Sequence, residues 1–178
     1  ESLTSDLLFL SNPRNDLYEQ NSLLSIVTEA IDLLQPQALM NDCLIQFEYD
    51  DTLEYCVNCN ETRIRQVLIN LIKNSIEAME QSGVVGDIYI NLTYKDSDYL
   101  ITVRDNGPGI ETPILTQIFN PFFTTKTKGS GLGLSISNQL MNEHGGKILV
   151  DSEIGKGTTF TLSLPMYDLP YLNTAVEL

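Results

Sequence analysis

Two asparagines and a glutamate fall on one stripe of an expected helix, in the segment N-L-I-K-N-S-I-E-A-M that spans residues 70–79. At about 100° per residue, Asn70, Asn74 and Glu77 share one face, and the opposite face is apolar. Asparagine is an indifferent helix former, because its amide competes for nearby backbone groups. Its short amide oxygen suits a hard cation such as Mg²⁺. The alternative is an ordinary solvated face, on which Glu, Lys and Gln would be expected instead.

The segment D-N-G-P-G at residues 105–109 places an acid at the end of an apolar stripe. Asp105 shares its expected strand face with Ile101 and Val103. A buried carboxylate is costly unless it accepts hydrogen bonds. An exocyclic amine such as that of adenine is a suitable donor. An ordinary hairpin turn would explain the glycines, but it would not explain the buried acid.

A glycine-rich segment, N-P-F-F-T-T-K-T-K-G-S-G-L-G-L-S at residues 120–135, leads into an expected helix. Glycine lets a backbone approach a phosphate closely, and a helix N-terminus offers free N–H groups. Lys126 and Lys128 flank the glycines. The segment matches neither the Walker A pattern nor the dinucleotide fingerprint. A further motif, G-K-G-T-T-F at residues 155–160, reads alone as a turn into a strand.

Composition excludes several classes of protein. The formal net charge is −14 with ten Lys and Arg, which argues against a nucleic-acid partner. A polyanionic ligand would need local positive charge or a cation of its own. No apolar run is long enough to span a membrane, so we expect a soluble, cytoplasmic chain. Cys56 and Cys59 lack a second pair for zinc, and we expect unpaired thiols.

The spacing of apolar residues predicts the elements that position these motifs. Helices are expected at 21–40, 61–81 and 132–143, and strands at 44–49, 53–57, 147–152 and 158–164. Two further alternating strands, around Ile88–Leu92 and Tyr99–Val103, resemble a hairpin. The long irregular stretch at 106–131 is typical of a functional loop. The fold class is therefore α/β, a two-layer sandwich with helices on one face of a mixed sheet.

These motifs, in this order over about residues 22–165, resemble the catalytic, ATP-binding domain of bacterial sensor histidine kinases of the GHKL superfamily. N-L-I-K-N-S-I-E-A is similar to the N box, and D-N-G-P-G to the first glycine box. I-F-N-P-F-F-T-T-K is similar to the F box, and G-S-G-L-G-L-S to the second glycine box. The short F-F-T-T-K segment resembles the lid of nitrogen-regulatory and sporulation kinases.

The resemblance implies a Bergerat-type fold with an ATP lid, and it assigns roles to individual residues. Asn74 would bind Mg²⁺ with Asn70 assisting, and Lys126 would reach the phosphates. Asp105 would accept a hydrogen bond from the adenine amine, with Thr158 nearby through water. Phe122 and Phe123 would anchor the lid. The remaining ATP-contacting positions that the resemblance implies are Gly107, Gly109, Ile110, Gly129, Ser130, Gly131, Leu132, Gly133 and Leu134.

The chain departs from the family pattern at two positions. Glu77 occupies a position where several members carry Lys or Tyr, and Asn60 replaces the usual acidic residue before the N-box helix. His144 matches a helix-closing H-G-G rather than a phosphoacceptor motif. We therefore expect residues 1–16 to end an upstream dimerisation helix that carries the acceptor. Residues 17–165 would form the ATP-binding domain, and the tail at 166–178 has no assigned role.

The function that the resemblance implies is transfer of the γ-phosphate of Mg²⁺-bound ATP to that upstream histidine, for relay to a response-regulator aspartate. The full-length protein would be a homodimer, this part of it a monomer, and any membrane anchor would lie upstream. Three alternatives remain. The first two are an ATPase of the gyrase, MutL or Hsp90 kind and an anti-sigma type serine kinase, both of which favour glutamate at the position of Asn70. The third is a nucleotide-binding module without catalysis.

Overall fold

The computed structural model describes residues 17–126 and 129–166. The expected end of an upstream helix at 1–16, nearly all of the tail and Lys128 lie outside these residues. Within the described ranges, no helix is both long enough and apolar enough to cross a bilayer.

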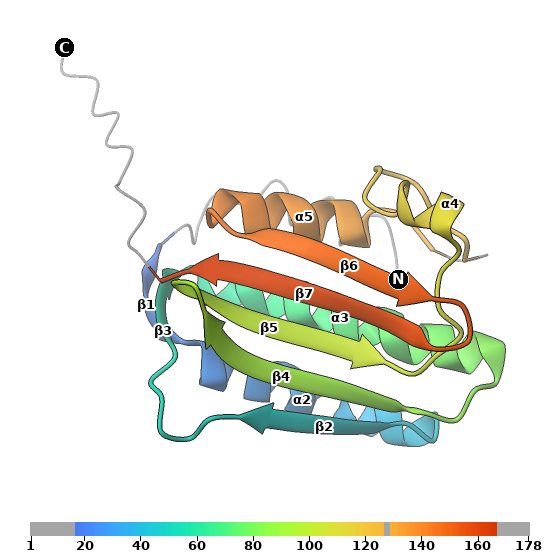
Figure 1. The fold of residues 1–178 in the computed structure, drawn as a ribbon, viewed down its shortest axis with the longest axis horizontal. Coiled ribbons are helices and arrows are strands. Elements are labelled where there is room, and N and C mark those ends of the chain that lie inside the picture. Colours follow the sequence, from blue (N-terminus) through green and yellow to red (C-terminus); the bar gives the residue numbers. More distant parts are fainter. Residues whose placement is uncertain (1–16, 127–128, 167–178) are drawn as a thin grey trace, which may run out of the picture.

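A five-stranded mixed sheet forms one layer of the fold, in the order β2-β4-β5-β7-β6 (Figure 1). β2 pairs with β4 in parallel, and the other neighbours are antiparallel. The hairpin predicted from the alternating pattern is confirmed as β4 and β5. The strands are β2 (Leu44–Tyr49), β4 (Asp87–Lys95), β5 (Asp98–Asp105), β6 (Lys147–Glu153) and β7 (Gly157–Pro165).

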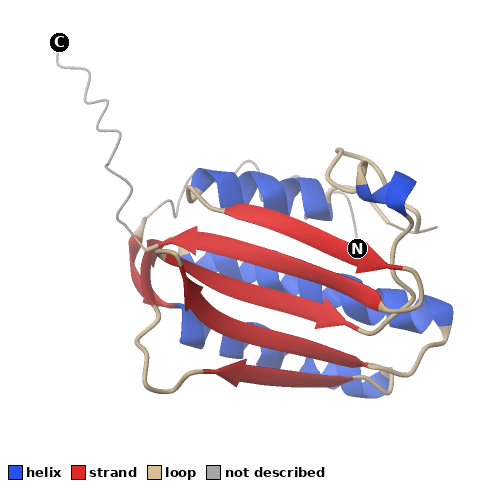
Figure 2. Ribbon diagram, in the orientation of Figure 1, coloured by secondary structure: helices blue, strands red, loops and turns tan. Residues whose placement is uncertain are grey.

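Three helices cover one face of this sheet and form the second layer (Figure 2). They are α2 (Leu23–Met40), α3 (Glu61–Ser82) and α5 (Gly133–Glu143). A short helix, α4 (Thr112–Leu115), lies in the segment that is expected from the sequence to be irregular. The predicted α/β sandwich is confirmed, and so are its three long helices to within two residues at each end.

Local sequence explains where α3 begins and ends. Asn60 caps the N-terminus, because its Oδ1 accepts a hydrogen bond from the backbone N–H of Arg63 at 3.1 Å. Gly83 ends the helix with φ 67°, a left-handed conformation that glycine adopts without strain. The buried face of α3 then packs on the inner face of the sheet, where Ile88, Ile90 and Leu92 of β4 are almost fully buried.

The structure corrects the sequence prediction at the start of the domain. Residues 19–22 form a strand, β1 (Glu19–Ser22), which pairs antiparallel with β3 (Cys56–Cys59). The helix predicted from residue 21 therefore begins at Leu23. The strand predicted at 53–57 begins three residues later than expected, at Cys56. Leu23 N–H donates to Tyr55 C=O at 2.8 Å and joins the two segments. This pairing links distant residues, so local periodicity does not reveal it.

Candidate functional site

A cleft of about 990 Å³ opens between α3, the end of β5 and the segment that precedes α5. Twelve of the predicted site residues line it, and two, Gly107 and Leu132, do not. The predicted residues that line the cleft are Asn70, Asn74, Asp105, Gly109, Ile110, Lys126, Gly129, Ser130, Gly131, Gly133, Leu134 and Thr158. The tertiary structure thus brings together motifs that are up to 88 residues apart in the sequence.

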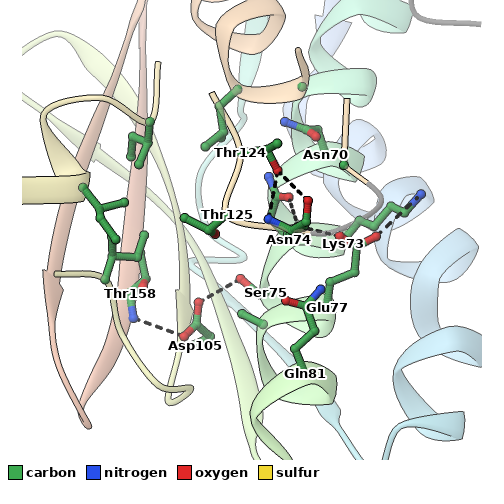
Figure 3. A pocket seen from close by; sticks show the side chains of 18 of the residues that line it. Asn70, Lys73, Asn74, Ser75, Glu77, Gln81, Asp105, Thr124, Thr125 and Thr158 are labelled. Atoms are coloured by element: carbon green, nitrogen blue, oxygen red, sulfur yellow. Dashed lines mark hydrogen bonds and ion pairs between the residues drawn. The ribbon is translucent and has the colours of Figure 1, made fainter. Parts of the chain in front are cut away.

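Asp105 lies at the inner end of the cleft and is only 3% exposed, as the apolar strand face predicted. Its Oδ1 accepts hydrogen bonds from the backbone N–H groups of Gly107 at 3.0 Å and Thr158 at 3.1 Å. Its Oδ2 accepts one from Ser75 Oγ at 3.0 Å (Figure 3). A carboxylate offers about four acceptor positions, so one remains for a donor in the cleft.

Burial raises the pKa of Asp105 above its ordinary value, and the three hydrogen bonds oppose that shift. The Thr158 hydroxyl is engaged elsewhere, since it lies 3.0 Å from Ser152 Oγ. Thr158 therefore contacts Asp105 directly through its backbone N–H. The carboxylate is held in one orientation by three separate elements, α3, the loop after β5 and β7.

The two asparagines of α3 have different environments. Asn70 Nδ2 donates to Ser137 Oγ of α5 at 2.9 Å, which ties the two helices together. Asn74 Oδ1 accepts a hydrogen bond from the Lys126 ammonium at 2.8 Å. Lys126 Nζ also forms an ion pair with Glu77 Oε2. Glu77, to which the sequence assigned no role, is thus a partner of the cleft lysine.

The donor set at Asn74 fits a magnesium ion that brings most of its own ligands. The Lys126 ammonium already contacts the Asn74 amide oxygen, which shows that a positive charge can be placed next to this oxygen. The described residues contain no cluster of three or more His, Cys, Asp or Glu side chains that could form a metal cage. Mg²⁺ commonly takes one or two protein oxygens together with phosphates and water. Asn74 would hold it here, with Asn70 as a neighbouring amide.

The N-terminus of α5 is left without a side-chain cap, unlike those of α2 and α3. The first two residues of this helix, Gly133 and Leu134, line the cleft. A helix N-terminus carries backbone N–H groups without helical partners and a partial positive charge. The arrangement suits an anion such as phosphate.

Three glycines at the start of α5 and just before it are in close contact with other parts of the protein. A Cβ on Gly133 would lie 2.4 Å from Asn70 Oδ1, and one on Gly131 would lie 2.4 Å from the Phe122 carbonyl carbon. A Cβ on Gly129 would lie 2.6 Å from Thr124 Oγ1. Gly133 thus lets α5 pack against α3, and Gly129 and Gly131 let the loop before α5 fold closely on itself. The approach of these glycines to a phosphate stays a prediction.

The first glycine box has a similar explanation. A Cβ on Gly109, whose φ is 76°, would lie 2.2 Å from the Glu153 carbonyl oxygen at the end of β6. Gly107 does not line the cleft, but its N–H orients Asp105. Ile110 N–H donates to Ser152 Oγ at 2.8 Å, which fixes this loop on the sheet. The box therefore positions Asp105 and one cleft wall.

Sequence reasoning missed an apolar wall of the cleft. Ile114 and Ile118 line it together with Phe123 and Phe160. The four-residue spacing of the two isoleucines is a helical signal inside a stretch that was expected to be irregular. Phe123 packs partly buried against the core, as expected of a lid anchor. The same expectation is wrong for Phe122, which is 70% exposed.

His144 has a structural role, in agreement with its expected place at a helix end. It is 3% exposed, and its Nδ1 donates to the Leu140 carbonyl at 2.7 Å while its Nε2 accepts from Asn60 N–H at 3.1 Å. Burial, followed by the nearby Arg63 charge, lowers its pKa, and the Leu140 contact opposes that shift. Both ring nitrogens are occupied, so this histidine is not available as a phosphoacceptor.

A mixed sheet covered by helices on one face, with a buried acid and an uncapped helix at its cleft, defines an α/β sandwich with a cleft suited to an anionic ligand. Residues 59–168 match the family described as histidine kinase-, DNA gyrase B- and HSP90-like ATPase. The catalytic domain of the histidine kinase ThkA superposes with a TM-score of 0.74 at 36% identity, over 84% of this chain and 95% of that domain. The chain belongs to this ATPase family, and within it to the histidine kinase catalytic domains.

Curated relatives agree with this assignment. Sporulation kinase A of Bacillus subtilis is 40% identical over 166 residues, which cover 93% of this chain and 27% of the kinase. Sensor histidine kinase ZraS of Escherichia coli is 35% identical over 164 residues, 92% of this chain and 34% of that protein. The predicted likeness to sporulation kinases is confirmed. Sporulation kinases E and C of the same organism as sporulation kinase A are matched over 22% and 37% of their lengths, so the chain spans about a third or less of these relatives.

Proposed function

We propose that this chain binds ATP with Mg²⁺ in the cleft and transfers the γ-phosphate to a histidine on an upstream dimerisation domain, for relay to a response-regulator aspartate. Asp105 carries the proposal, because a buried, oriented carboxylate with one acceptor position left matches the exocyclic amine of adenine. The structure of the histidine kinase ThkA in complex with a response regulator supports the relay step, because ThkA is 31% identical to this chain.

The remaining cleft residues are placed to bind and orient the nucleotide. The apolar wall of Ile114, Ile118 and Phe123 suits the faces of a base. The uncapped N-terminus of α5 and the Lys126 ammonium suit the phosphates. Magnesium, when bound, would neutralise developing charge on the transferred group. The chain itself would supply positioning and backbone N–H groups.

In the transfer step the bond between the γ-phosphorus and the β–γ bridging oxygen breaks, and ADP leaves with that electron pair. A phosphorus–nitrogen bond forms to the acceptor imidazole, whose proton passes to a base on the acceptor domain. No base of this chain is needed. Asn70 is an amide bound to Ser137, and an amide cannot take a proton from water. This disfavours the ATPase alternative.

The test is incubation of the chain with γ-labelled ATP and a separately expressed acceptor-histidine domain of the same protein. Label that appears on the acceptor, labile to acid and stable to base, is the expected result. Nucleotide binding without label on the acceptor would contradict phosphotransfer and favour a binding module. Rapid release of free phosphate by the chain alone would favour an ATPase.

A further inference from the structure

The ion pair between Glu77 and Lys126 lies at the cleft, and the proposed function gives Glu77 no role. The Lys126 ammonium bridges Glu77 Oε2 and Asn74 Oδ1. The side chains of Lys126 and Glu77 are only 25% and 26% exposed, so their charges interact more strongly than those of a fully solvated pair. Lys73 lies farther from Glu77, at 3.9 Å, and is more exposed.

The charges around the cleft do not favour a bare polyphosphate. Among the described residues that line it, Lys73 and Lys126 are cationic, and Glu77, Glu80 and Asp105 are acidic, which gives a formal charge of −1. The chain as a whole carries −14. The more buried of the two lysines, Lys126, is already neutralised by Glu77. At Lys126, metal-free ATP therefore finds a positive charge that Glu77 already neutralises.

We propose that Glu77 is a specificity-determining residue that makes the cleft select ATP bound to a divalent cation over metal-free ATP. The inference rests on the proposed ATP site. By pairing with Lys126, the carboxylate withholds that ammonium from free polyphosphate. A nucleotide that carries its own dication brings the missing positive charge and has the Asn74 oxygen as a ligand. Selectivity thus comes from the pairing of Lys126 with Glu77.

The test compares ATP binding with excess Mg²⁺ and with EDTA, by calorimetric titration of the whole 178-residue chain. Glu77→Gln keeps the size of the side chain and removes its charge. We expect it to bind metal-free ATP about fivefold more tightly, the scale of one partly exposed charge pair. Affinity for Mg²⁺-bound ATP should change less than about twofold, since there the dication supplies the charge.

Two control variants separate the pair from a general charge effect. Glu80→Gln removes the same charge from the same helix and the same cleft, and it should keep the wild-type preference for Mg²⁺-bound ATP. In a Lys126→Gln background, Glu77→Gln should bring no gain, because the lysine that it releases is absent. Circular dichroism of each variant checks that the fold is kept.

An unchanged preference in Glu77→Gln overturns the inference. An equal effect of Glu80→Gln also overturns it, because that result would indicate a general effect of negative charge in the cleft. A gain in affinity for metal-free ATP that persists without Lys126 overturns it as well, because it would indicate direct repulsion of phosphate by Glu77. These outcomes differ from failure of the proposed function. If the proposed ATP site itself were wrong, the wild-type chain would bind no ATP even with Mg²⁺, and if only phosphotransfer were wrong, the binding comparison would still apply.

Discussion

Lys126 and Asn74 are 52 residues apart in the sequence, and the lysine ammonium donates a hydrogen bond to the asparagine amide oxygen at 2.8 Å. The contact joins the glycine-rich segment to the middle of α3. It places a positive charge on the oxygen that the N-box resemblance assigns to Mg²⁺. A metal ion bound to this oxygen would lie next to the Lys126 ammonium, so cation binding is linked to the position of the segment before α5.

Replacement of Asp105 by Asn should weaken ATP binding by roughly 1.5–3 kcal/mol, the scale of a hydrogen bond to a charged group. The remaining carbonyl oxygen can still accept from Gly107 and Thr158, so the fold should be kept. Calorimetric titration with Mg²⁺-bound ATP measures the loss. Asp98→Asn, at the other end of the same strand, is the matched control. Unchanged affinity in Asp105→Asn would contradict the adenine assignment.

Asn74→Ala should abolish Mg²⁺-dependent phosphotransfer while it largely preserves stability, because Asn74 lines the cleft rather than the core. Label transfer to the acceptor domain and thermal unfolding are the two measurements. Asn142→Ala, an exposed asparagine on α5, should behave as wild type in both. An Asn74→Ala chain that remained fully active would show that the metal ligand is elsewhere.

Gly133→Ala should destabilise the fold by about 1–3 kcal/mol, because its Cβ would lie 2.4 Å from an Asn70 oxygen whose amide is bound to Ser137. Denaturant unfolding measures the cost. In an Asn70→Ala background, the same change should cost clearly less. Equal costs in the two backgrounds would place the conflict at another contact of residue 133.

The stability of the fold should depend on His144 below neutral pH. Its pKa is lower in the folded chain than the ordinary 6.5, so the unfolded chain binds the proton first as the pH falls. The contribution is complete above pH 6.5 and is lost as the pH falls toward the folded pKa. Protonation would also remove the acceptor for Asn60 N–H.

The measurement for His144 is the free energy of unfolding at about pH 7.5 and about pH 5.5, for the wild type and for His144→Gln. The wild type should lose more stability on acidification than the variant, because the variant has all the carboxylates and lacks only the imidazole. Equal losses would mean that His144 has the same pKa in both states.

Much of the fold followed from short-range patterns. The helical stripe of α3 and the alternation of β4 and β5 repeat within a few residues, so the buried faces and the position of Asp105 could be inferred from the sequence. The β1–β3 pair could not, because its partners are separated by the whole of α2 and β2. The role of Phe122 was also misjudged, since a motif does not determine which of two adjacent side chains is buried.

The sequence by itself determined which residue types stand at which spacing: the amide stripe, the acid at the end of an apolar strand, and the glycines before a helix. Only the tertiary structure decided how they combine. It gave Glu77 the Lys126 ammonium as a partner, bound Asn70 to Ser137, and placed Gly133 against the Asn70 amide. The physical reason is that these contacts join segments 49 to 67 residues apart, whose approach depends on burial of the whole core rather than on local propensity.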